Sequence, residues 1–353
     1  MRRIVWCAFV VLLFAAILTA EYGMFPRSSG VEGAPIPVGE ARAGAIASSS
    51  SRIKSLYAQL EAEIRRVADA GKRRDGQALL KRPVFMAVRG RKSKEGEIVQ
   101  ALKANGLLAS DVTSLFPGKE PMPFIAAPGG TCDTHHSYPG GLVDHSLSNI
   151  QDGLALASTW ERRNQKTKAN PSALRLDADL IRLTALWHDV AKTMTIEWNN
   201  DGSCTRDPES KIAKTGAHHV WGVSEALFRG YPPDFVVALA SAHNPPIKGD
   251  GLEELVNYLK AAALISGKRY EAAGLARDGT ALTTKPPLEA FINNLDDHSW
   301  VMHDRTYPES AEALREQLRK KGIPEEEVRW EAHKIMADRG DLPIWQELRK
   351  QGK

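Results

Sequence analysis

The histidines of this chain are unevenly distributed, and most of them fall in a few short motifs. The segment THHSYPGGLVDHSLSNI, residues 134–150, holds three of the ten histidines in the 353-residue chain. Further along, LIRLTALWHDVAKT places His188 beside Asp189 near the end of an apolar stripe at helical spacing. Imidazole and carboxylate together suit Mn, Fe, Zn, Co or Ni, and a carboxylate can bridge two such ions.

Further histidines follow at the ends of other predicted helices. GAHHVWGVSEAL offers His218 and His219 at a helix start, and VVALASAHNPP ends a helix at His243. His145 lies one turn into the helix that opens with GGLVDHSL. The ends of neighbouring helices in a bundle can meet at one point. Four helix-end histidines with an adjacent His-Asp pair therefore predict one shared metal site.

The order and the residues of these motifs resemble those of a known family. HHSYPGGLVDHSL and HDVAK are similar to the HD-domain superfamily of metal-dependent phosphohydrolases, in the form found in certain 3′-to-5′ exoribonucleases and relaxase-associated proteins. The resemblance covers residues 131–266. It implies an all-α fold, an HD-domain helical bundle, with one or two divalent metal ions. It also implies hydrolysis of a small phosphorylated substrate, either a nucleotide or a phosphodiester.

The resemblance also implies a metal-ligand set. His145, His188 and Asp189 would bind a first ion. His218 and His243 would complete a second site, with Asp189 bridging the two. His218 is preferred to His219 because it stands four residues before a glycine, as in the family.

Three further residues take roles from the same resemblance. Lys192 would contact a phosphate oxygen and, with Asp189, make up the catalytic pair. His135 and His136, which precede the Pro-Gly-Gly turn, would line the substrate cleft rather than bind metal.

One departure from the family pattern leaves a rival interpretation open. The family ends its ligand set with an aspartate on a later helix, where this chain has Lys260 or Ala263. Asp250, Asp296 or Asp297 can supply the missing carboxylate, but no spacing selects one. Without it, the alternative is a catalytically silent HD-fold module that binds or scaffolds partners.

A third interpretation rests on charge. Residues 65–94 contain eleven Lys or Arg and only two acidic residues, a run that can attract nucleic acid. It would suit a nucleic-acid-processing factor, whereas the simpler explanation is a solvated helical surface.

The N-terminus predicts a membrane segment. Residues 4–20 are uncharged and apolar, and as a helix they would span about 25 Å, close to the thickness of a bilayer core. We expect an uncleaved transmembrane anchor rather than a removed signal. Arg2 and Arg3 favour an N-terminus inside the cell, with the protein anchored in a bacterial-type inner membrane and its body in the periplasm.

Composition and periodicity divide the chain into five expected parts. They are 1–20 (anchor or signal), 21–51 (flexible linker rich in Gly, Pro, Ala and Ser), 52–125 (helical and basic region), 126–275 (HD domain) and 276–353 (C-terminal helical extension).

Smaller features complete the expected architecture. A helix is predicted from Ile53 to about residue 70, and TMTIEWNNDGSCTRDP predicts a small inserted β-hairpin around Asn-Asp-Gly. Cys132 and Cys204 can form a disulfide outside the cytoplasm, or remain two unrelated thiols inside it. The second His-Asp pair, at His303, is predicted to lie on the surface.

Overall fold

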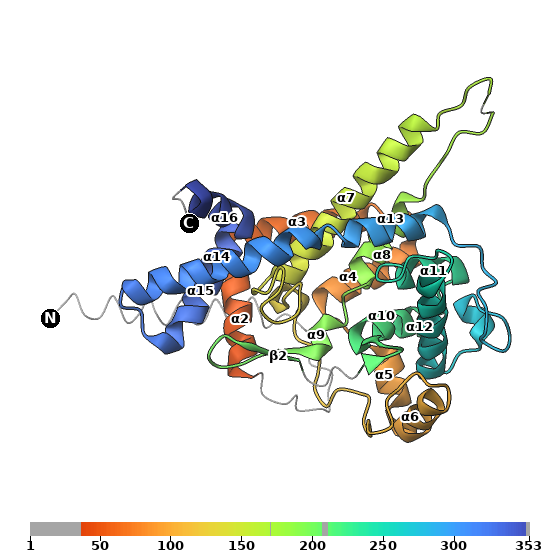
Figure 1. Cartoon of the computed structure of the whole chain (residues 1–353), viewed down its shortest axis with the longest axis horizontal. Coiled ribbons are helices and arrows are strands. Elements are labelled where there is room, and N and C mark those ends of the chain that lie inside the picture. Colours follow the sequence, from red (N-terminus) through yellow and green to blue (C-terminus); the bar gives the residue numbers. More distant parts are fainter. Residues whose placement is uncertain (1–36, 170, 207–210, 351–353) are drawn as a thin grey trace. The chain divides into compact units, whose positions relative to one another are not determined.

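Helices make up most of the fold, and two short antiparallel hairpins interrupt them (Figure 1). A computed structural model describes residues 37–350, except 170 and 207–210. The elements in chain order are α2 (Val38–Ser49), α3 (Ser51–Arg65), α4 (Ala70–Lys81), α5 (Met86–Arg91), η1 (Lys92–Lys94), α6 (Glu95–Ala104), η2 (Phe124–Ala126), α7 (Gly141–Arg163), α8 (Ala178–Trp187), α9 (Lys192–Thr195), β1 (Ile196–Trp198), β2 (Cys204–Arg206), β3 (Lys211–Ile212), β4 (Thr215–Gly216), α10 (Ala217–Arg229), α11 (Pro233–Ala240), α12 (Asp250–Ser266), η3 (Tyr270–Ala273), α13 (Leu288–Asp297), α14 (Trp300–Lys320), α15 (Glu325–Arg339) and α16 (Asp341–Lys350).

The membrane-anchored localisation expected from the sequence has to be corrected. Among the described residues, no helix combines the length and the apolarity that crossing a bilayer requires. The longest described helices, α7 and α14, carry charged residues along their length. The apolar segment 4–20, on which the expectation rested, lies outside the described residues.

The expected flexible linker is wrong in its described part. Residues 38–49 form α2, which buries Ala43, Ile46 and Ala47 against its neighbours. The small residues that resemble a linker serve close packing instead. A Cβ atom on Gly39 would lie 2.1 Å from the carbonyl oxygen of Trp198 in β1, so only glycine fits there.

The helix predicted from Ile53 is confirmed as α3, but it ends at Arg65 rather than near residue 70, where a separate helix, α4, begins. The side chain of Ser50 accepts the backbone N–H of Ile53 and caps the helix. Its apolar stripe of Ile53, Leu60 and Ile64 is fully buried, and the helix packs against α7. Helical periodicity therefore identified both the element and its buried face.

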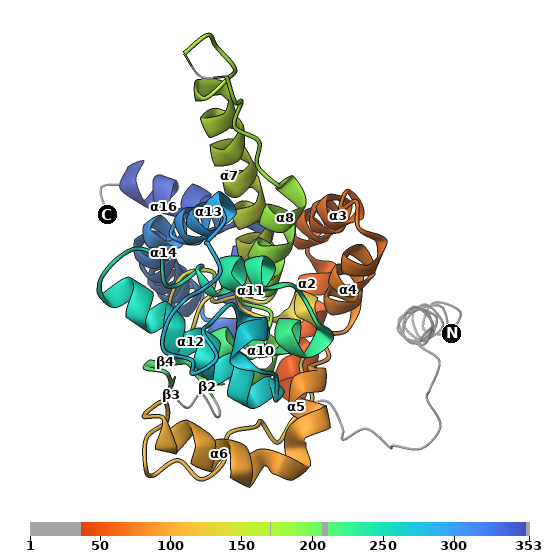
Figure 2. The same cartoon turned by 90° about the vertical axis from the view of Figure 1, so that its right-hand side faces the viewer.

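Three helices meet closely around Gly153 of α7. A Cβ atom there would lie 2.3 Å from an oxygen of Asp296 on α13 and 2.8 Å from Ile181 on α8. Figure 2 shows α7 and α8 side by side, with α13 next to them. The missing side chain thus lets the C-terminal end of α13 approach the centre of the fold.

The predicted hairpin is confirmed, and a second one was not expected. In the first, β1 and β2 pair antiparallel with Ile196 opposite Arg206. In the second, β3 and β4 are joined by Ala213 and Lys214, both with positive φ (50° and 68°). Such a turn usually carries glycine or asparagine, so this sequence gave no signal for it.

Cys132 and Cys204 form a disulfide, the first of the two alternatives left open by the sequence. It joins the loop that carries His135 and His136 to strand β2 across 72 residues of sequence. A cross-link over that length restricts the unfolded chain and stabilises the fold by up to about 4 kcal/mol.

Reduction of this disulfide is expected to lower the free energy of unfolding by about 2 to 4 kcal/mol. Urea denaturation with and without reductant measures the change. The Cys132→Ser variant serves as the control, because its denaturation midpoint should not respond to reductant. Equal midpoints for the oxidised and reduced wild-type protein would contradict the expectation.

Candidate metal centre

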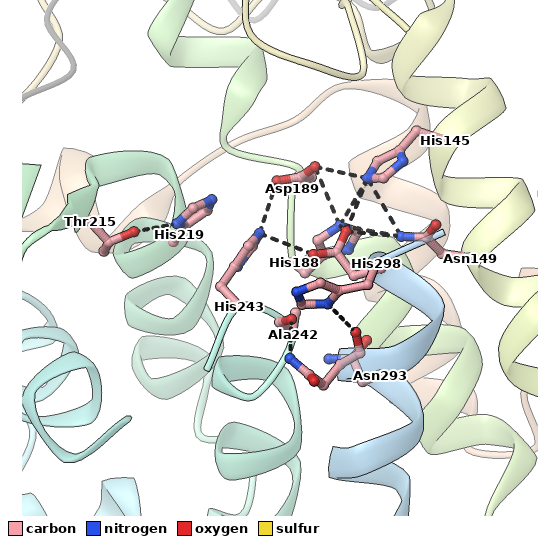
Figure 3. A network of polar contacts seen from close by, with 12 residues as sticks. His145, Asn149, His188, Asp189, Thr215, His219, Ala242, His243, Asn293 and His298 are labelled. Atoms are coloured by element: carbon pink, nitrogen blue, oxygen red, sulfur yellow. Dashed lines mark hydrogen bonds and ion pairs between the residues drawn. The ribbon is translucent and has the colours of Figure 1, made fainter. Parts of the chain in front are cut away.

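The ends of α7, α8 and α13 bring two histidines and two aspartates to one buried point. His145 lies one turn into α7, His188 caps the end of α8, and Asp189 follows it. The fourth member, Asp297, is the last residue of α13. Their side chains are no more than 3% exposed. Figure 3 shows the side chains of His145, His188 and Asp189 pointing toward one another.

The spacing of the ligand atoms in this group is narrow. Nε2 of His145 lies 3.3 Å from Nε2 of His188, 3.2 Å from Oδ2 of Asp189 and 3.3 Å from Oδ1 of Asp297. Nε2 of His188 lies 3.3 Å and 3.1 Å from the same two oxygens. An ion bound at about 2.0–2.2 Å by such ligands holds neighbouring donor atoms about 3.0–3.6 Å apart. These four residues can therefore hold a metal ion.

The orientation of His188 suits a ligand. Its Nδ1 lies 2.9 Å from the carbonyl oxygen of Ala185, within hydrogen-bond distance. When Nδ1–H donates there, the lone pair of Nε2 faces the cluster, as in most histidine–metal sites. The side-chain nitrogen Nδ2 of Asn149 lies 3.4 Å from Oδ1 of Asp297. It also lies 3.5 Å from Nε2 of His145 and 3.5 Å from Nε2 of His188.

A second group adjoins the first and shares its carboxylates. Oδ1 of Asp189 lies 3.5 Å from Nε2 of His218 and 4.0 Å from Nε2 of His243, while Oδ2 faces the first group. The two oxygens of Asp297 also face different groups. Its Oδ1 faces the first group, and its Oδ2 lies 3.4 Å from Nε2 of His243. The buried Oδ1 of Asp189 makes no hydrogen bond. A buried carboxylate oxygen that accepts no hydrogen bond is available to bind a cation.

Both histidines at the start of α10 lie in this second group. His219 joins Asp189 and His243 in a set of donor atoms close enough for one ion, and its ring stacks on His243 at 3.4 Å. Its Nδ1 is within hydrogen-bond distance of Thr215 and Tyr258. His218, preferred from the sequence, is the one within ion-pair distance of Asp189.

The charges of the group attract a cation. Burial alone would raise the pKa of Asp189, but Lys192 and His188 hold that pKa well below its ordinary value. Burial alone would lower the pKa of His188, but Asp189 and Asp297 raise it well above the usual range. Without an ion, protonated His188 and Lys192 thus supply the positive charge that two buried carboxylates require.

Of the three aspartates considered from the sequence as a further ligand, Asp297 is the one that lies in the cluster. Its neighbour Asp296 is also buried, but neither of its oxygens has a hydrogen-bond partner, and burial raises its pKa well above the ordinary value. Asp250 is exposed at the start of α12. Lys260 lies over the ring of Tyr270, and Ala263 is fully buried in α12, so neither replaces the missing ligand.

The loop before α7 brings His135 and His136 to the edge of the first group. Their Nδ1 atoms lie 3.2 Å apart, and the ring centres lie 5.1 Å and 5.5 Å from that of His145. His136 has a positive φ of 51°, a strained conformation for this residue type. A Cβ on Gly141 would lie 1.8 Å from its carbonyl oxygen, which explains the second glycine of Pro-Gly-Gly.

Lys192 is buried at the start of α9, beside the cluster. Its ammonium group donates to Oδ2 of Asp189 and to the carbonyl oxygen of Gly129. The residue predicted to contact phosphate therefore also helps to fix a metal-ligand candidate.

The expectation that His303 lies on the surface is wrong. Its Nδ1 lies 2.9 Å from Asp341, its side chain is 15% exposed, and its ring centre is 4.2 Å from that of His136. The short run around it lacks a clear apolar stripe, because packing against α16 and the site loop buries it instead.

Comparison with known proteins does not identify a family for this chain. Searches of protein-family models, curated proteins and solved structures found no match to the chain. The residues themselves therefore carry the functional argument.

Replacing Asp297 with asparagine is expected to remove most of the bound transition metal, because an amide supplies no negative charge to the cluster. Metal analysis of the purified full chain tests this. Asp296→Asn and Asp250→Asn are matched controls that should retain the wild-type metal content. Full occupancy in Asp297→Asn would show that this carboxylate is not a ligand.

Metal affinity is expected to rise with pH. Because the raised pKa of His188 keeps its proton on the metal-free protein, an ion must displace that proton to bind. Below that pKa the affinity should increase about tenfold per pH unit for each proton released. Chelator competition with Zn²⁺ between about pH 6 and pH 8 measures the slope. An affinity independent of pH would contradict it.

Proposed function

We propose that this chain is a metal-dependent phosphohydrolase of the HD type that acts on a nucleotide or another phosphoester. The main support for the proposal is that the two oxygens of Asp189 face two separate groups of histidines. A carboxylate shared in this way is typical of sites that hold two ions and cleave phosphate esters. The HH…PGG…H and HD-x-x-K motifs of the sequence support the same class.

The donor set favours particular metals. Imidazole nitrogens outnumber carboxylates, and no cysteine approaches the cluster among the described residues. This mixture suits Mn, Fe, Zn, Co or Ni better than Mg or Ca, which prefer oxygen ligands. His145, His188, Asp189 and Asp297 would hold one ion. His218 or His219, with His243 and the two aspartates, would hold a second.

A bound ion of this kind lowers the pKa of a coordinated water and offsets charge on phosphate oxygens. The chain's own residues supply the rest. Asp189 and Asp297 would hold the two histidine groups together, and Lys192, whose ammonium group donates to Asp189, would contact a phosphate oxygen of the substrate. His135, the more exposed of the two histidines in the loop before α7, would contact the substrate, with His136 behind it.

Hydrolysis tests the proposal directly. The full chain loaded with Mn²⁺, Zn²⁺ or Fe²⁺ is expected to hydrolyse members of a panel of nucleotides, p-nitrophenyl phosphate and bis-p-nitrophenyl phosphate. His188→Ala and Asp189→Ala should lose both the metal and the activity, because they remove ligands of the shared centre. Lys260→Ala, at the family's expected ligand position, is the control and should keep both.

Two results would count against the proposal. Metal-loaded wild-type protein that hydrolyses no member of the panel would favour the silent binding module. Full turnover in both alanine variants would show that the reaction occurs elsewhere.

A further inference from the structure

His303 of α14 and Asp341 of α16 are in contact beside the candidate metal centre, although they lie far apart in the sequence. Nδ1 of His303 is 2.9 Å from both oxygens of Asp341. The carboxylate is 3% exposed and also accepts the hydroxyl of Thr306. The proposed metal chemistry gives this pair no role, although several contacts hold it in place.

The pair lies one imidazole away from the metal ligands. The ring of His303 packs against that of His136 at 4.2 Å, and His136 packs against His145 at 5.5 Å. The hydroxyl of Tyr307, one turn further along α14, donates to the carbonyl oxygen of Ser137. Helix α14 is therefore fixed to the loop that borders the site.

The groups around His303 determine which ring nitrogen can react. Asp341, from α16, engages Nδ1, so Nε2 lies on the opposite edge of the ring. His136, from the loop before α7, is a second titratable group in contact with the ring of His303. A carboxylate at Nδ1 fixes the tautomer and the orientation of the ring, an arrangement found in histidines that transfer protons.

We infer that His303 is the general acid that protonates the leaving oxygen of the phosphoester, with Asp341 as its positioning residue. This inference rests on the proposed function. It makes the C-terminal helices part of the active site, because both residues come from the segment after 298.

The step balances without a further reactant. The oxygen of the attacking water forms a bond to phosphorus while the bond from phosphorus to the leaving oxygen breaks. The electron pair of that bond remains on the leaving oxygen, which takes the proton from Nε2 of His303. The imidazole is reprotonated from solvent, which also receives the proton lost by the attacking water.

Leaving-group dependence tests this inference. A p-nitrophenolate departs without a proton, whereas a nucleoside alkoxide requires one. We therefore compare His303→Gln and Asp341→Asn with the wild type on two pairs of substrates. The monoester pair is p-nitrophenyl phosphate and AMP, and the diester pair is thymidine 5′-p-nitrophenyl phosphate and TpT. The variants should lose about 10²- to 10⁴-fold in kcat/KM on the alkoxide substrate and less than about tenfold on the nitrophenyl substrate.

The ratio of the two kcat/KM values within one preparation is independent of the folded or metallated fraction, so partial misfolding does not obscure the result. Asp304→Asn, which changes an exposed neighbour on α14, should leave the ratio unchanged. An equal loss on both substrates would assign His303 a structural role, and no loss on either would remove it from the reaction. Turnover of neither pair by a wild type that hydrolyses other members of the nucleotide panel would reject this inference alone, whereas turnover of no substrate at all would reject the proposed function and this inference with it.

Discussion

Two carboxylates buried at one point impose the main electrostatic requirement on this fold. Asp189 and Asp297 are almost completely shielded from water, and both face the same imidazoles. Two uncompensated anions in such a place would cost several kcal/mol each. His188 and Lys192 offset that cost by carrying protons, and a metal ion offsets it more completely. The fold thus encloses a site with a strong preference for positive charge.

The surrounding elements can be understood by how they maintain this arrangement. Gly153 lets α13 approach α7, which brings Asp297 to the histidines. The loop before α7 is fixed by close backbone contacts, by the disulfide at Cys132 and by the hydroxyl of Tyr307. The residues of the cluster lie at or near helix ends, so small shifts of whole helices would change the spacing of their donor atoms. Close packing around the site limits such shifts.

The sequence predicted those parts of the site that depend on local patterns. The positions of His145 and His188 at helix ends followed from apolar periodicity and short motifs, whereas His243 lies in the turn after α11, three residues beyond the end of that helix. Asp297 could be named only as one of three candidates, because its place depends on how α13 packs. His303 was judged from its own weakly patterned segment, yet contacts with residues distant in sequence bury it. Composition likewise suggested a linker at 38–49, where small residues instead allow α2 to pack closely.

Anomalous diffraction from crystals of the full chain, recorded at the absorption edge of the added metal, would locate any ion bound in this cluster. We expect a peak bounded by His145, His188, Asp189 and Asp297. We also expect a second peak on the other side of Asp189, next to His243. A map with no peak in contact with either oxygen of Asp189, from crystals grown with saturating metal, would contradict the proposed metal centre.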